Sequence, residues 1–309
     1  MTATALAVAA GSLTFQNPVL LAAGTAAYGR ELADVMSLET LGGLVTKAVS
    51  LEPRDGAAAP RVTDFEGGML NAVGLANPGV DAVLAEDLPW LAAHVQRPRV
   101  LVNVVGREAH EFGAVVARLD AAAGFQGFEL NVSCPNVKQG GLEFGADPAA
   151  LAEVVRGARA ATKRPLFVKL SPLVPSLADA ARRAVDAGAD GITVINTMPG
   201  LVVDVERRRP VLGFGSGGVS GPGLLAIGVL ATWRVRQAVT VPVIGAGGVQ
   251  RATDVLQYLI AGASAVAVGT AALADPKLPA RLVRDLARWC ERHEVARLAD
   301  LIGTLEWPR

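Results

Sequence analysis

The chain has 309 residues, of which 51% are hydrophobic and 19% charged, and its 29 basic residues balance 29 acidic ones. This composition is enough for a large buried core and excludes a disordered chain, and without a basic block a nucleic-acid-binding surface is not expected. Two cysteines and three histidines, without the spacing typical of zinc ligands, predict neither a disulfide framework nor a metal site.

The first charged residue is Arg30. The preceding segment lacks the positively charged start of a signal peptide, and Gln16, Asn17 and Pro18 interrupt its apolar stretch. We therefore expect a soluble, cytoplasmic protein without a membrane-spanning segment.

Short runs rich in Val, Ile and Leu alternate along the chain with helical stretches rich in Ala and Arg. We expect strands at 19–22, 43–47, 100–104, 127–132, 166–170, 191–195, 242–245 and 264–268. Helices are expected at about 31–40, 80–95, 108–122, 148–161, 176–187, 222–237, 251–261 and 278–293. Eight near-continuous apolar strands that alternate with helices predict an α/β fold of one domain over 1–309, a (β/α)8 TIM barrel.

The alternative architecture is an open, doubly wound sheet. Such a sheet places a glycine fingerprint after its first strand, whereas Gly24-Thr25-Ala26 lacks the G-x-G-x-x-G spacing. Two connections, 48–79 and 196–221, are longer than ordinary βα loops. Because long loops in compact domains are usually functional, we expect both to lie over the C-terminal face of the barrel.

Polar side chains stand at or near the ends of five successive predicted strands: Lys47, Asn103, Asn131, Lys169 and Asn196. In a (β/α)8 barrel the chemistry takes place at these strand ends, so the five residues predict an active site on one rim. Only five of the 29 basic residues are lysines. Two of those five stand at this rim, which favours an anionic substrate or an electron-rich cofactor ring.

Glycines cluster after the last two predicted strands. Residues 245–248 read GAGG, and Gly269-Thr270 follow the eighth strand. Loops after strands 7 and 8 commonly bind phosphate in this fold, through bare backbone N–H groups and a helix N-terminus. We therefore expect a phosphorylated cofactor or substrate.

Cys134 lies just beyond the fourth predicted strand, within the run NVSCPN at 131–136. A thiol on this rim is suited to act as a nucleophile or as a general base. A nucleophilic thiol usually has a histidine partner, and no histidine falls at a strand end, which favours the base. Cys290, in a C-terminal helix, is expected to be structural.

Together these motifs resemble the class 1 dihydroorotate dehydrogenases, which are FMN-containing (β/α)8 enzymes. The resemblance runs from Asn17 to about Pro276 and is carried by VTKA at 45–48, NAVGLANPG at 71–79, NVSCPNVKQGGLEFG at 131–145, VKLSP at 168–172, INT at 195–197, GGVSGP at 217–222, GAGGV at 245–249 and AVAVGT at 265–270. EPR at 52–54, DLPWL at 87–91 and the KQGG of the catalytic loop are similar to the NAD-linked class 1B catalytic subunit. Membrane-bound class 2 enzymes carry Ser at the position of Cys134. The chain departs from the family at GAAAP, 56–60, and at PGLLA after Gly221.

The resemblance implies oxidation of (S)-dihydroorotate to orotate in de novo pyrimidine biosynthesis, with Cys134 as the general base, Lys47 as a second catalytic residue and hydride transfer to FMN. It implies FMN contacts at Thr25, Lys47, Ala48, Asn103, Asn131, Lys169, Ile195, Gly221, Gly247, Gly248, Gly269 and Thr270. It implies substrate contacts at Lys47, Asn71, Ala72, Val73, Gly74, Leu75, Asn131, Asn196 and Thr197.

The resemblance also implies a homodimer of catalytic chains and an electron-transfer subunit with FAD and a [2Fe–2S] cluster, together a heterotetramer that reduces NAD. The chain itself shows neither a dinucleotide fingerprint nor four cysteine ligands. The alternatives are a fumarate-linked class 1A enzyme, a related flavoprotein that acts on free dihydropyrimidines, and a phosphate-binding isomerase or aldolase. The last of these leaves the cluster at 134–136 unexplained.

Overall fold

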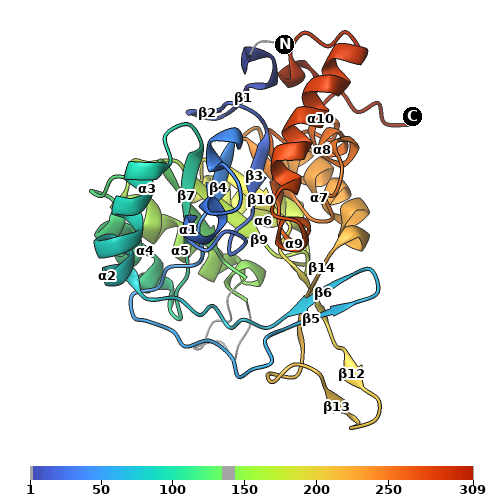
Figure 1. Ribbon diagram of the computed structural model, residues 1–309. Coiled ribbons are helices and arrows are strands. Elements are labelled where there is room, and N and C mark those ends of the chain that lie inside the picture. The colour runs from blue at the N-terminus through green and yellow to red at the C-terminus, as the bar shows by residue number, and fades with distance from the viewer. Residues whose placement is uncertain (1–2, 134–142, 309) are drawn as a thin grey trace.

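The computed structural model describes residues 3–133 and 143–308, and its centre is a closed barrel of eight parallel strands (Figure 1). The strands follow one another around the barrel in chain order, and the last pairs with the first. They are β3 Val19–Leu21, β4 Gly43–Val45, β7 Arg99–Val104, β8 Gly127–Asn131, β9 Leu166–Leu170, β10 Gly191–Val194, β15 Val243–Ala246 and β16 Ala265–Val268. The predicted (β/α)8 barrel is confirmed.

Helices cover the outside of the barrel. They include α4 Ala109–Leu119, α5 Pro148–Ala161, α6 Leu177–Asp186, α7 Leu225–Ala238, α8 Ala252–Ile260, α9 Thr270–Ala274 and α10 Leu278–Arg292. The helix expected at 31–40 is wrong: the chain forms only α1 Arg30–Ala33 and the 3-10 turn η2 Leu38–Thr40. Glu39 there accepts hydrogen bonds from the backbone nitrogens of Gln96 and Arg97, a tertiary contact that the local pattern does not reveal.

The helix expected at 80–95 is present but irregular. It runs through α2 Val80–Ala82, a π-helical turn η3 Val83–Asp87 and α3 Leu88–His94. The irregular turn comes directly before Pro89, which has no backbone N–H to continue the α-helical pattern. Shorter 3-10 turns are η1 Ala3–Leu6, η5 Phe144–Ala146, η6 Pro222–Leu224 and η7 Leu298–Leu301.

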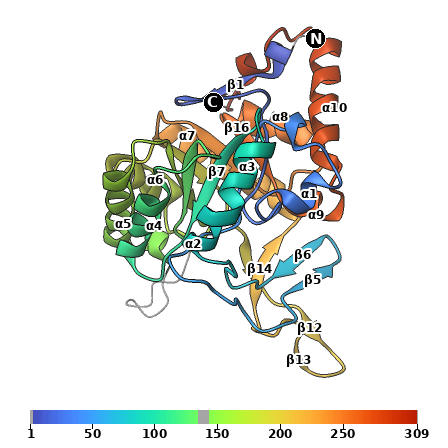
Figure 2. The ribbon, with the colours of Figure 1, turned by 60° about the vertical axis from the view of Figure 1, so that its left-hand side comes forward.

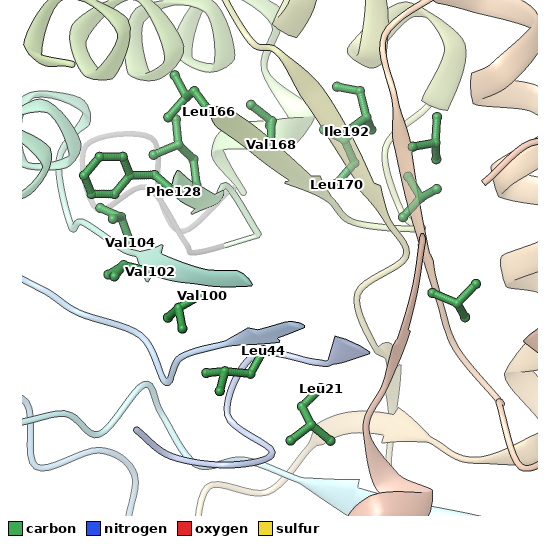
Figure 3. Close-up of a cluster of buried hydrophobic side chains, with 14 of the residues drawn as sticks. Leu21, Leu44, Val100, Val102, Val104, Phe128, Leu166, Val168, Leu170 and Ile192 are labelled. Atoms are coloured by element: carbon green, nitrogen blue, oxygen red, sulfur yellow. The ribbon is translucent and has the colours of Figure 1, made fainter. Parts of the chain in front are cut away.

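Side chains on the barrel strands alternate between two cores. Outward-facing residues such as Leu21, Val102 and Phe128 pack in the layer beneath the helices (Figure 3). Inward-facing residues such as Leu20 and Phe167 form a second buried cluster. An N-terminal hairpin, β1 Val8–Ala10 and β2 Leu13–Phe15, contributes Val8, Ala10, Leu13 and Phe15 to that inner cluster.

The two long connections pair with each other to form an antiparallel sheet. Its strands stand in the order β11 Met198–Gly200, β14 Gly217–Ser220, β6 Gly68–Asn71 and β5 Val62–Phe65. A short hairpin, β12 Val203–Asp204 with β13 Arg209–Pro210, extends from the same connection. Figures 1 and 2 show this sheet at the end of the barrel opposite the chain termini. The sequence predicts long loops over this end, and the structure adds their pairing.

Within residues 3–133 and 143–308, no helix combines the length and the apolar character needed to cross a membrane.

Candidate active site

The barrel interior is divided into a polar half and a small-residue half. Asn103, Glu129, Asn131, Lys169 and Thr193 alternate with outward-facing apolar neighbours, so they point into the barrel from four consecutive strands, β7 to β10. The corresponding inward positions of β15 and β16 carry only small side chains near the strand ends, including Ala246 and Ala267. The mouth of the barrel therefore offers space on one side and hydrogen-bonding groups on the other.

Two asparagines from separate strand ends meet at this mouth. The Asn196 Nδ2 donates to the Asn131 Oδ1 at 3.5 Å, and that oxygen also accepts from the Ser133 backbone nitrogen at 3.3 Å. The backbone nitrogen of Thr197 donates to the Asn196 Oδ1 at 2.8 Å. Both predicted substrate-contacting asparagines are thus held in one hydrogen-bonded group.

The paired long loops bring Asn71 to the same region. Its Nδ2 donates to the Gly218 carbonyl oxygen at 3.2 Å across the β6–β14 pair. A Cβ at Gly218 would collide with the side chain of Thr197, so strand β14 lies directly against that residue. Asn71 and Thr197, which are far apart in sequence, therefore share one wall of the mouth.

The segment after Asn71 has a tightly defined backbone. Gly74 and Leu75 both adopt left-handed conformations, with φ of 72° and 58°. The Asn77 Nδ2 donates to the Leu75 carbonyl oxygen at 2.8 Å, while its Oδ1 accepts from the backbone nitrogen of Ser50. Backbone hydrogen bonds also join Ala72 to Arg61 and Val73 to Ala57. Asn77 was not among the predicted site residues, although Asn-Pro-Gly at 77–79 is a recognisable turn signal.

Glycines form a bare backbone cradle beside the small-residue half. Gly221, Gly247 and Gly248 have φ of 132°, 122° and 74°, which favour glycine, and a Cβ at Gly248 would collide with the backbone of Leu225. Gly269 lies next to Thr25, since a Cβ on Gly269 would lie 3.8 Å from the Thr25 Oγ1. Predicted cofactor residues from three loops therefore converge here.

Two side chains that the sequence did not point to support this cradle. The buried Tyr258 hydroxyl donates to the Gly247 carbonyl oxygen at 2.7 Å, and burial raises the pKa of Tyr258 well above its ordinary value. The Thr270 Oγ1 donates to the Ser220 Oγ at 2.7 Å, which joins the start of α9 to the end of β14. Ile195 also reaches the cradle, because a Cβ at Gly247 would lie 3.5 Å from the Ile195 Cγ1.

The two rim lysines have different surroundings. Lys169 is buried inside the barrel, while Lys47 is partly exposed. The Lys47 backbone nitrogen donates to the Ala27 carbonyl oxygen at 2.8 Å, and the Tyr28 hydroxyl donates to the Ala48 carbonyl oxygen at 3.1 Å. These bonds fix the backbone of the segment that carries Lys47 and Ala48.

Cys134 lies outside the described residues, but both flanks of its loop are described. The Ser133 Oγ and the Glu143 Oε2 are buried, with no hydrogen-bond partner among the described residues. Burial raises the pKa of the Glu143 carboxyl group, and a hydrogen bond from Ser171 acts in the opposite direction. Cys290 is buried in α10, and burial raises the pKa of its thiol. Over the part of the chain that is described, His, Cys, Asp and Glu side chains do not gather in threes around a possible metal position.

Comparison with known proteins gives the same family throughout. The profile of the family described as dihydroorotate dehydrogenase matches residues 5–289. The chain is 47% identical to the dihydroorotate dehydrogenase B (NAD(+)) catalytic subunit of Pelobacter propionicus, over 95% of this chain and 96% of that protein. It is 45% identical to the protein of the same name from Geobacter sp. strain M21, over 97% of this chain and 98% of that one.

Among solved structures, the fold is similar to that of a DHODH from Eimeria tenella in complex with ferulenol. The TM-score is 0.82 at 23% identity, over 97% of this chain and 88% of the other.

Proposed function

The chain belongs to the dihydroorotate dehydrogenase family, and we propose that it is the catalytic subunit of an NAD-linked enzyme that oxidises (S)-dihydroorotate to orotate. The observation that carries this proposal is the barrel mouth, where a half lined by lysines and asparagines faces a glycine cradle. The proposal includes a place in pyrimidine biosynthesis and a cytoplasmic location.

The described residues fit FMN as the cofactor. Gly221, Gly247 and Gly248 leave their backbone N–H groups bare, as a phosphate requires, and Thr270 adds a hydroxyl at the start of α9. Inward-facing alanines leave room for a flat ring beside buried Lys169. Bound there, FMN would supply the redox chemistry by accepting a hydride from C6 of the substrate. Lys169 supplies a positive charge suited to an electron-rich ring.

The asparagines suit a substrate that carries both ring N–H and C=O groups. An amide side chain both donates and accepts, so Asn71, Asn131 and Asn196 are able to match such a ring on several edges. Lys47, at the exposed side of the same rim, complements the substrate carboxylate. We assign these residues, with 72–75 and Thr197, to substrate binding.

Cys134 is proposed as the general base that removes the proton from C5. Its thiolate is the basic form, and the described residues on each side place its loop at the mouth: Ser133 is bonded to Asn131, and the Gly145 backbone nitrogen donates to the Val132 carbonyl oxygen at 2.9 Å. Glycines at 140, 141 and 145 suit a loop that excludes water from the reaction.

The NAD-linked form requires a second polypeptide. We propose that this chain forms a homodimer and binds an electron-transfer subunit that carries FAD and a [2Fe–2S] cluster. Support comes from large apolar side chains exposed on the connection that bears β12 and β13: Leu201, Val205 and Phe214 are 55%, 76% and 71% exposed. Exposed apolar groups of this size commonly mark protein interfaces.

The test is to assay the purified chain with different electron acceptors. Alone, it should oxidise dihydroorotate with an artificial acceptor but reduce NAD poorly, and addition of the co-expressed partner should restore NAD reduction. Efficient NAD reduction by this chain alone would refute the two-subunit proposal. Efficient fumarate reduction by the lone chain would instead identify a class 1A enzyme.

A further inference from the structure

Glu129 is a buried carboxylate inside the barrel to which the proposed reaction assigns no role. It lies in the middle of β8, is only 1% exposed, and is the one acidic side chain in the eight described barrel strands. Its Oε1 accepts a hydrogen bond from the Asn103 Nδ2 at 2.8 Å. Because burying a carboxylate is unfavourable unless it is well hydrogen-bonded, its presence here calls for a specific explanation.

The pair stands directly beneath the barrel mouth. Asn103 and Glu129 are register partners across β7 and β8, and the next inward residue of β8, Asn131, is the register partner of Lys169. The backbone of Asn103 is fixed as well: its nitrogen donates to the Thr46 Oγ1 at 3.2 Å, and its carbonyl oxygen accepts from Val49 at 2.8 Å. Only the orientation of the Asn103 amide group is then left to be determined.

A carboxylate determines that orientation because it only accepts hydrogen bonds. The Asn103 Nδ2 must face Glu129, which turns the Asn103 Oδ1, an acceptor, away from it. A glutamine at 129 would both donate and accept, so either orientation of the Asn103 amide would satisfy it. The identity of residue 129 therefore decides which atom Asn103 presents to a ligand.

We propose that Glu129 is a positioning residue, which holds the Asn103 amide so that its carbonyl oxygen faces the flavin site and accepts from a ring N–H. This inference rests on the proposed function, because it takes FMN as the ligand. The Glu129 carboxylate has a second effect on the same ring: its negative charge opposes the uptake of electrons nearby, against the positive charge of Lys169.

The test compares Glu129→Gln with the wild-type protein. We expect the FMN affinity of the apoprotein, measured by quenching of FMN fluorescence, to fall about tenfold, as for the loss of one well-formed hydrogen bond. The reduction potential of the bound flavin should rise, because a negative charge is removed and a turned amide would offer its N–H group. The melting temperature of the apoprotein should change little, because glutamine is isosteric and still bonds to Asn103.

A matched control makes the same chemical change at the other end of the barrel. Asp190 accepts from the Leu166 backbone nitrogen at 2.9 Å, just before β10, so Asp190→Asn should leave FMN affinity and potential unchanged. If Glu129→Gln has wild-type FMN affinity and potential, or lowers only the melting temperature, the carboxylate is merely structural and the inference is wrong. Failure of the wild-type apoprotein to bind FMN would refute the proposed function itself.

A swapped pair covers the case in which Glu129→Gln does not fold. Asn103→Asp combined with Glu129→Gln keeps one carboxylate and one amide in contact, but the carboxylate now lies at position 103. We expect this variant to fold, to bind FMN more weakly than the wild type and to have a lower flavin potential. Wild-type FMN affinity in the swapped variant would contradict the inference, because contact alone would then be sufficient.

Discussion

The Asn196 Nδ2 lies 3.5 Å from the Asn131 Oδ1, although 65 residues separate the two in sequence. One amide stands at the end of β8 and the other just beyond β10, so closure of the barrel brings them together across the end of β9. Each thereby restricts the orientation of the other, and together they offer a preformed set of donors and acceptors at the mouth.

Asn196→Ala should raise the KM for dihydroorotate about tenfold, because one substrate hydrogen bond is lost and Asn131 loses its neighbour. FMN affinity should stay near the wild-type value, since we assign Asn196 to the substrate alone. Steady-state kinetics and FMN titration measure the two effects separately. An unchanged KM would remove Asn196 from the substrate site.

Cys134→Ser should keep FMN but slow flavin reduction by dihydroorotate at least a hundredfold, roughly the contribution of a general base, because a serine hydroxyl is far less acidic than a thiol. The deficit should shrink as the pH rises and more of the serine is deprotonated. Stopped-flow absorbance measures the rate, with Cys290→Ser as the control that should behave like the wild type. A Cys134→Ser protein that reduces its flavin at the wild-type rate at neutral pH would disprove the assignment.

Gly248→Ala should weaken FMN binding well over tenfold, because φ is 74° and the added Cβ would collide with the backbone of Leu225. Gly303→Ala is the matched control: its φ is 75°, but a Cβ there has nothing within 4 Å. The control should lose about 1 kcal/mol of stability from its backbone conformation while keeping FMN affinity. Equal FMN affinity in the two variants would show that the cradle does not hold the phosphate.

Glu143→Gln should raise the melting temperature near neutral pH. Burial raises the pKa of Glu143, so its carboxyl group is bound to a proton more readily in the folded than in the unfolded chain. The stability associated with this proton is present at acid pH and is lost as the pH rises through the raised pKa. Glutamine does not ionise, so the gain should vanish below the ordinary glutamate pKa of about 4.3. Thermal melting as a function of pH measures this, and a pH-independent difference would argue against a titration effect.

The barrel strands were predictable because each is a local apolar run. β9, for example, is LFVKL between turn signals, and its lysine identified the rim. The β6–β14 pairing was not predictable, since it joins Asn71 to Gly218 across 147 residues and one strand begins Gly-Gly. Such a pair is stable only after the barrel has brought both loops to the same end.

The polar rim was predictable for a similar reason, but its supporting residues were not. Tyr258 and Asn77 act through hydrogen bonds to backbone atoms of other loops, which leave no mark on the local sequence. Glu129 did have a signal, an acidic residue inside an apolar strand. The division of the rim into FMN and substrate contacts came from the family resemblance and not from the residue pattern.

The most direct test of the account is a single turnover without oxygen. The purified chain should be yellow, and one equivalent of dihydroorotate should bleach its visible flavin absorbance while one equivalent of orotate forms. Dihydrouracil, which lacks the carboxylate that Lys47 is proposed to bind, should leave the absorbance unchanged. A colourless protein, or a flavin that dihydrouracil bleaches and dihydroorotate does not, would contradict the account.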